Sequence, residues 1–257
     1  MGMLTGKNIL VTGVTATNSI AYAVADIAAA EGAGVAVSAA GRAVSLARRV
    51  TQRLDPVPPL LEVDVTNEQH LRDLPAALRE HFPDGLDGVV HSIAFADPEQ
   101  ALGGKFLHTN WDAVATALQV SAFSLKSLTM AVKPLLRPGA SVVGLTFDAT
   151  VSWPAYDWMG VAKAALESTS RYLARYLGPD GIRCNLVAAG PIDSLAKRAI
   201  PGAEQFNGVW SERAPLAWDS KDAVPAAKAV VALLSDWFPA TTGEMIHVDG
   251  GLHSTGA

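Results

Sequence analysis

Cysteine, positive charge and long apolar runs are all scarce in this sequence of 257 residues. The single cysteine, Cys184, cannot form an internal disulfide, and no Cys/His spacing suggests a metal site. A net charge of −5 excludes a general attraction to nucleic acid or to anionic membranes. The most apolar segment, residues 20–30, is too short to span a bilayer, and residues 1–6 lack the pattern of a secretory signal. We therefore expect a cytoplasmic protein that contacts neither membrane nor nucleic acid.

What the sequence does have is a regular alternation of short apolar segments with longer helical ones. The apolar segments are typical of parallel strands covered on both faces, and we expect them at 7–12, 35–39, 60–63, 86–91, 141–145, 182–188 and 244–248. Helices are expected at 19–31, 44–54, 68–81, 111–136, 156–177 and 222–235. The pattern predicts an α/β fold, a single doubly wound Rossmann-type domain over residues 1–257, with about seven parallel strands and helices on both faces.

The turn after the first strand has features of a dinucleotide site. Gly13 follows the strand directly, and Ser19 stands at the expected start of the first helix, with small residues between them. Small residues let the backbone approach a diphosphate, and the start of a helix offers unpaired N–H groups. The usual fingerprint contains more glycines than Gly13 alone, so an ordinary strand-to-helix turn is the alternative.

Three other strand ends supply candidate cofactor contacts. After the second strand, where an acidic residue would bind the ribose of NAD, the sequence has Arg42, which is suited to stacking on adenine or to binding a 2′-phosphate. Asp64 follows the third strand, although it also suits the start of the next helix. The fourth strand is followed by Ser92, Ile93 and Ala94. These positions alone leave the choice between NAD and NADP open.

The strongest local signal is the pair Tyr156 and Lys163 on one expected helix. Seven residues make nearly two helical turns, an axial separation of about 10 Å, so both side chains emerge on one face. A lysine there can hold the nicotinamide ribose while the tyrosine reaches a substrate oxygen, and the lysine's charge favours negative charge developing nearby. A chance tyrosine beside a surface lysine is the alternative.

Five motifs together resemble the enoyl-(acyl carrier protein) reductases of type II fatty acid synthesis, a divergent branch of the short-chain dehydrogenases. They are Gly13 with 19–21, the run 91–95, Tyr156 with Lys163, the run 185–192, and 240–244 with 248–251. The resemblance covers essentially the whole chain. It implies hydride transfer from NADH, rather than NADPH, to the β-carbon of a trans-2-enoyl thioester carried on acyl carrier protein or coenzyme A. An enolate forms on the thioester oxygen, Tyr156 hydrogen-bonds that oxygen, and Lys163 binds the cofactor ribose.

The resemblance also implies a set of site residues. Expected cofactor contacts are Gly13, Ser19, Ile20, Arg42, Asp64, Val65, Ser92, Ile93, Ala94, Lys163, Ala189, Pro191, Ile192 and Ser194. Expected substrate contacts are Phe95, Phe147, Tyr156, Met159, Leu195 and Ile200. The catalytic group is Tyr156 and Lys163, together with Phe147 at a position where many members have a second tyrosine. Two further departures affect fine preferences: Asp193 and Ser194 stand where Arg-Thr is frequent, and Ala40 and Gly41 replace larger residues of the adenine pocket.

Residues 191–215 look irregular, and the part from 192 to 215 is expected to form a substrate lid. Members of the family that act on very long chains have a longer insertion here, so we expect short-to-medium acyl chains. The family also implies a homotetramer. The apolar residues 230–234, and again Met245, Ile246 and Val248, are a candidate contact surface, with core packing as the alternative.

Two competing functions remain. A carbonyl reductase of the same superfamily resembles Tyr-x3-Lys with a serine about thirteen residues before the tyrosine, but here those positions hold Met159 and Val143. A non-catalytic dinucleotide-binding protein would have no need of both Tyr156 and Lys163.

Overall fold

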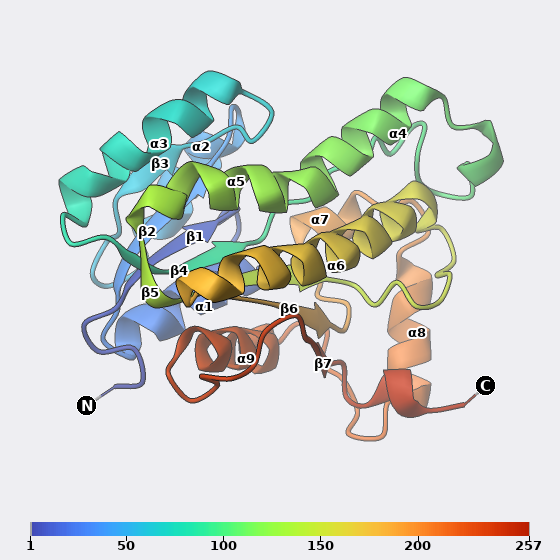
Figure 1. Cartoon of the computed structure of the whole chain (residues 1–257). Helices are drawn as coiled ribbons and strands as arrows, with labels where there is room; N and C mark the ends of the chain where they lie inside the picture. The colour runs from blue at the N-terminus through green and yellow to red at the C-terminus, as the bar shows by residue number, and fades with distance from the viewer. Residues whose placement is uncertain (1, 257) are drawn as a thin grey trace.

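The computed structural model describes residues 2–256, apart from the side chains of residues 196, 204, 205 and 207. A parallel sheet of seven strands runs through this part of the chain, in the order β3-β2-β1-β4-β5-β6-β7 (Figure 1). The strands are β1 (Asn8–Thr12), β2 (Gly34–Ala39), β3 (Leu60–Glu62), β4 (Leu86–His91), β5 (Leu136–Thr146), β6 (Arg183–Ala189) and β7 (Met245–Val248). The order reverses on either side of β1, which pairs with β2 and β4, and ligands bind at such a reversal. The single doubly wound α/β domain is confirmed.

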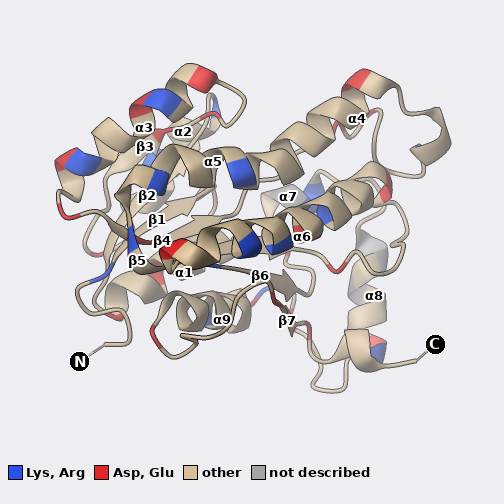
Figure 2. Ribbon diagram, in the orientation of Figure 1, with Lys and Arg blue, Asp and Glu red and all other residues tan. Residues whose placement is uncertain are grey.

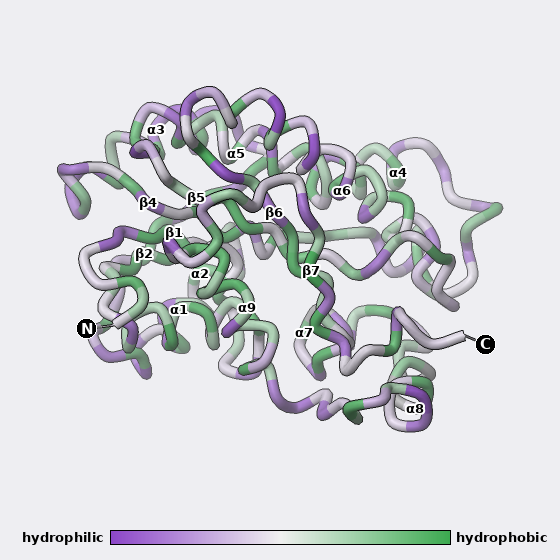
Figure 3. The backbone as a smooth tube through the Cα atoms, turned by 60° about the horizontal axis from the view of Figure 1, so that its bottom comes forward, coloured by the Kyte–Doolittle hydropathy of each residue, from purple (hydrophilic) through white to green (hydrophobic). Residues whose placement is uncertain are grey.

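Helices cover both faces of the sheet (Figure 1). They are α1 (Ile20–Ala30), α2 (Ala43–Thr51), α3 (Glu68–His81), α4 (Trp111–Leu118), α5 (Ser124–Val132), α6 (Asp157–Leu177), α7 (Leu195–Arg198), α8 (Glu204–Arg213) and α9 (Val224–Leu234). One apolar core lies between the sheet and α3, α5 and α6, and another lies between the sheet and α1 and α9. The strands are mainly hydrophobic in Figure 3, whereas the charged residues of Figure 2 lie mostly on the outer helices and loops.

The long helix expected at 111–136 is interrupted by a wide turn. Residues Gln119–Phe123 form one π-helical turn between α4 and α5. Ser124 Oγ donates to the carbonyl of Val120 at 2.6 Å, and Ser121 Oγ donates to the carbonyl of Phe95 at 2.9 Å. The widened turn therefore directs two serine side chains toward the loop after β4, a placement that periodicity alone does not predict.

The prediction of an irregular segment at 191–215 was wrong, because two helices form there. Helix α7 begins at Ser194, whose hydroxyl accepts a hydrogen bond from the Lys197 N–H. Helix α8 buries Phe206 and Trp210 against the aromatic side chains that follow β5. Both helices depend on tertiary contacts that a short, weakly periodic sequence does not reveal.

The apolar segment 230–234 belongs to the core rather than to a contact surface. Val230, Val231, Leu233 and Leu234 are at most 3% exposed, and α9 packs on α1 and the sheet. The alternative of core packing is therefore the correct one. Cys184 is fully buried in β6, and burial raises the pKa of its thiol to about 11, as expected of a structural cysteine. Within residues 2–256, no helix is long and apolar enough to cross a membrane.

Candidate active site

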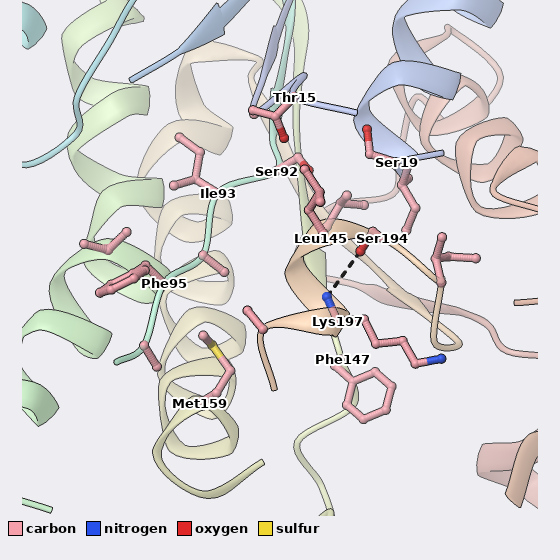
Figure 4. A pocket seen from close by; sticks show the side chains of 18 of the residues that line it. Thr15, Ser19, Ser92, Ile93, Phe95, Leu145, Phe147, Met159, Ser194 and Lys197 are labelled. Atoms are coloured by element: carbon pink, nitrogen blue, oxygen red, sulfur yellow. Dashed lines mark hydrogen bonds between the residues drawn. The ribbon is translucent and has the colours of Figure 1, made fainter. Parts of the chain in front are cut away.

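A large cavity opens at the carboxyl ends of the strands, where ligands bind in this class of fold. It encloses about 690 Å³ and is lined by residues that follow β1 to β6, together with residues of α6 and α7. In Figure 4, Thr15 and Ser19 lie toward one end of it and Met159 and Phe147 toward the other. Its lining residues run from Gly13 to Phe206, so one site is formed by segments from most of the chain.

Every residue predicted to bind cofactor or substrate lines this cavity, with one exception. Arg42 is exposed at the start of α2 and is not among the lining residues. The lining on the cofactor side is Gly13, Ser19, Ile20, Asp64, Val65, Ser92, Ile93, Ala94, Lys163, Ala189, Pro191, Ile192 and Ser194. The predicted substrate residues present are Phe95, Phe147, Tyr156, Met159, Leu195 and Ile200.

The turn after β1 brings backbone close to the cavity. Gly13 has φ of +77°, and a Cβ placed on it would lie 2.1 Å from the carbonyl oxygen of Ser92. Only glycine fits there without displacing β4, so this position demands Gly for two reasons. Ser19 caps α1 by accepting from the Tyr22 N–H, and both Ser19 and Ile20 line the cavity. The start of α1 therefore presents positive partial charge to the cavity, which fits the diphosphate of a dinucleotide.

The side chains at the end of β2 are small and uncharged. Ser38, Ala39 and Ala40 line the cavity there, with no carboxylate among them. Asp64 lines the same region from the end of β3, and its carboxylate accepts hydrogen bonds from the N–H and hydroxyl of Thr66. Both interpretations of Asp64 are therefore compatible: it orders the start of the next segment and also faces the cavity.

Tyr156 and Lys163 both line the cavity. Tyr156 precedes α6, Lys163 lies on it, and both side chains are less than a tenth exposed. Lys163 Nζ donates to the carbonyl of Leu145 at 2.9 Å. Burial lowers the pKa of Lys163 to about 8, and burial also raises the pKa of Tyr156, with a further contribution from Glu167. At neutral pH the phenol is therefore a hydrogen-bond donor and the lysine a cation.

Phe147 stands at the centre of an aromatic cluster. Its ring lies 5.2 Å from that of Tyr156, 5.6 Å from Phe206 and 5.5 Å from Trp210. Phe206 and Trp210 belong to α8, so this helix is packed directly against the residue beside the candidate catalytic phenol. The cavity wall here is therefore apolar, and such walls suit hydrophobic ligands.

The loop after β4 is fixed from the π-helical turn. His91 is fully buried and its Nε2 lies 2.7 Å from Ser124 Oγ, while burial lowers the pKa of the imidazole to about 3. Ser121 Oγ bonds both the N–H and the carbonyl of Phe95 at 2.9 Å. The neutral His91 and these paired bonds hold the segment that carries Ile93 and Phe95 into the cavity.

Two residues that the sequence analysis did not single out belong to the site or its support. Lys197 lines the cavity and pairs with Asp193 at 2.6 Å. Glu167 is buried one turn beyond Lys163 and bonds the end of β5. Neither position stands out in the sequence, because Lys197 lies beside Arg198 and Glu167 lies on a helix that also carries Lys163, Arg171 and Arg175.

A family model described as "Enoyl-(Acyl carrier protein) reductase" matches residues 13–253. The chain belongs to the enoyl-(acyl carrier protein) reductase family. The stretch matched contains the Gly13 turn, Tyr156, Lys163 and residues 192–215, so the match covers every residue that lines the cavity.

Relatives in this family are similar along nearly their whole length. The enoyl-acyl-carrier-protein reductase (NADH) of Mycolicibacterium smegmatis is 45% identical over 97% of this chain and 97% of its own. The NADH enzyme of Neisseria meningitidis is 37% identical over 98% and 96% of the two chains. The Staphylococcus aureus relative, whose name specifies NADPH, is 34% identical over 98% of both.

Substituting Gly13 with alanine tests the turn in this family member. Gly13→Ala is expected to lower the free energy of unfolding by about 2 kcal/mol or more, because backbone strain adds to the contact with Ser92. Urea unfolding monitored by fluorescence measures the loss. Gly41→Ala is the matched control, since Gly41 also has positive φ but no atom lies within 4 Å of its added Cβ. Equal losses in the two variants would contradict the close approach at Gly13.

Proposed function

We propose that this protein reduces the double bond of a trans-2-enoyl thioester, carried on acyl carrier protein or coenzyme A, with NADH as the hydride donor. The observation that carries the proposal is the placement of Tyr156 and Lys163 together in an apolar cavity that begins at the Gly13 turn. Membership of the enoyl-(acyl carrier protein) reductase family and the names of the relatives support the same reaction.

The chemistry divides between the cofactor and the side chains. When bound, the nicotinamide supplies a hydride to the β-carbon of the substrate. Tyr156 donates a hydrogen bond to the thioester oxygen, where negative charge develops as the enolate forms. Lys163 holds the ribose and places positive charge near that oxygen. The enolate then takes a proton from solvent water at the α-carbon, which completes the reduction. The aromatic wall around Phe147 keeps the acyl chain in a dry environment.

The carbonyl reductase alternative has less support. Val143, at the position where that chemistry has a serine, is fully buried in the core facing α1 and α9. The hydroxyl of Thr146 lines the cavity but donates to Glu167 at 3.0 Å. A non-catalytic binding protein is disfavoured because the cavity extends beyond the cofactor side to an apolar wall at Met159 and Phe147.

NADH is the proposed cofactor rather than NADPH. The exposed Arg42 lies outside the cavity lining, so a pocket for a 2′-phosphate has little support at the end of β2. The relatives from Mycolicibacterium smegmatis and Neisseria meningitidis are named for NADH, whereas the one from Staphylococcus aureus is named for NADPH. A cytoplasmic location is proposed from this role in fatty acid synthesis.

Replacing Tyr156 with phenylalanine tests the reaction. In a crotonyl or longer enoyl thioester assay, wild type is expected to oxidise NADH with a higher kcat/KM than NADPH. Tyr156→Phe should lower kcat about 10²-fold with little change in NADH affinity, because the lost hydrogen bond acts on the developing oxyanion. Tyr172→Phe, an exposed tyrosine on the same helix, is the control. A Tyr156→Phe enzyme as fast as wild type would remove this phenol from the mechanism.

The lid, residues 192–215 with α7 and α8, should limit acyl chain length. The cavity of about 690 Å³ has to hold part of the cofactor as well as the acyl group. Each enclosed methylene contributes at most about 0.8 kcal/mol, and methylenes beyond the lid contribute little. We expect kcat/KM to rise through medium enoyl chains and then level off. Phe206→Ala should move that plateau to longer chains, while Trp237→Ala, at an exposed site, should not. A steep rise continuing into very long chains in wild type would refute the lid assignment.

A homotetramer is proposed on the family relationship and on exposed aromatic residues of α6 and of the π-helical turn before α5. Tyr172 and Tyr176 are 62% and 70% exposed one turn apart on α6, and Phe123 is 54% exposed before α5. Light scattering should give four times the mass of one chain. Replacing Tyr172 and Tyr176 with lysine should lower that mass, whereas Trp237→Lys should leave it unchanged. A monomer mass for wild type would exclude the tetramer.

A further inference from the structure

Glu167 is a buried carboxylate one helical turn beyond Lys163 on α6. Glu167 is only 7% exposed, and its Oε1 atom accepts two hydrogen bonds. The donors are the hydroxyl of Thr146 at 3.0 Å and the N–H of Ala149 at 3.1 Å. Removing a carboxylate from water costs free energy, so we expect Glu167 to have a function that an apolar residue could not perform.

The first part of that role is mechanical. Lys163 bonds the carbonyl of Leu145, and Glu167 bonds Thr146 and Ala149, so two successive turns of α6 grip the end of β5. Phe147 lies between the gripped residues and forms the wall beside Tyr156. The position of the substrate wall therefore depends on bonds made by α6 side chains.

The second part is electrostatic. Glu167 raises the pKa of Lys163 against the larger lowering by burial, and it adds to the raising of the Tyr156 pKa that burial begins. The other charged or titratable groups around this pair are His91 on β4, Asp148 after β5 and Arg171 on α6. His91 is neutral because burial lowers its pKa to about 3, and Asp148 pairs with His247. Among these described groups, Glu167 is the buried anion.

We propose that Glu167 is a positioning residue that fixes the Phe147 end of β5 and places a negative charge one helical turn from Lys163, where it favours the ammonium form of that lysine. The proposal rests on the proposed reductase function, in which Lys163 binds the cofactor as a cation and Tyr156 donates a hydrogen bond. One carboxylate thus links the geometry of the substrate wall to the charge of Lys163.

Two substitutions separate the charge from the hydrogen bonds. Glu167→Gln keeps the side-chain shape and an oxygen acceptor but removes the negative charge. Thr146→Val removes one donor and leaves the charge in place. NADH affinity, measured by fluorescence titration between about pH 6 and pH 10, reports the ionisation of Lys163. Steady-state kcat on a crotonyl thioester reports the positioning of the substrate wall.

In wild type, NADH affinity should be retained below the pKa of Lys163, about 8, and fall as pH rises through it. Glu167→Gln should move the midpoint of this fall to lower pH by about one unit, since a nearby negative charge no longer favours the ammonium. Thr146→Val should lower kcat several-fold and leave the midpoint where it is in wild type. Those two separate results together would support both parts of the proposal.

An unchanged midpoint in Glu167→Gln would overturn the electrostatic part, and an unchanged kcat in Thr146→Val would overturn the mechanical part. If Glu167→Gln fails to fold, Glu167→Asp serves instead, because it keeps the charge and shortens the reach. It should lower kcat, and a midpoint that falls by a full pH unit although the charge is retained would count against the electrostatic role. A wild-type protein that binds NADH but does not reduce enoyl thioesters would refute the proposed function and leave the midpoint comparison valid.

Discussion

The active-site cavity depends on how α6 is fastened to the carboxyl end of β5. Lys163 bonds the carbonyl of Leu145, and Glu167 bonds Thr146 and the chain just beyond it. Strand β5 in turn pairs with β4 and β6, so its end is held in the plane of the sheet. Phe147 directly follows β5 and Tyr156 directly precedes α6, so joining the strand to the helix holds the two rings 5.2 Å apart at the ends of the connecting segment.

The two ends of the cavity are built by different means. On the cofactor side the main contributors are backbone groups, at the Gly13 turn and the start of α1, where side chains are small. On the substrate side the contributors are large aromatic rings from the segment between β5 and α6 and from α8. The unpaired N–H groups at the start of α1 suit a charged diphosphate, and an apolar wall suits an acyl chain. Each end of the cavity therefore suits the group that it is proposed to bind.

The departure from the family at Asp193 has a local compensation. Its carboxylate accepts from Lys197 at 2.6 Å and from the hydroxyl of Ser220 at 3.0 Å, and its carbonyl accepts from the Asn18 amide. An acidic residue where arginine is frequent is thus matched by a lysine one helical turn later. This cluster joins the start of α7 to the cofactor turn and to the loop before α9.

Sequence reasoning predicted the features that local chemistry controls. Helix α3 and strand β4 have the expected limits, and the cap at Ser19 begins α1 as anticipated. It failed where the outcome depends on tertiary contact. Helix α8 is stabilised by packing of Phe206 and Trp210 against aromatic residues that follow β5. Arg42 follows β2 closely in the sequence but does not line the cavity. The role of Glu167 could not be predicted from the sequence, because its hydrogen-bond donor Thr146, at the end of β5, lies 21 residues earlier in the chain.

The π-helical turn at Gln119–Phe123 also changes how the whole α4–α5 segment has to be interpreted. Each residue of an α-helix advances by about 100°, so one extra residue in a turn rotates everything beyond it by that angle. A helical wheel drawn for α4 therefore loses phase when continued into α5. Because of that rotation, the two halves of this helical segment pack on different neighbours. Helix α4 packs on α6, and α5 packs on α3 as well as on α6. Deleting one residue here would restore a uniform helix and turn one of its halves away from its partners.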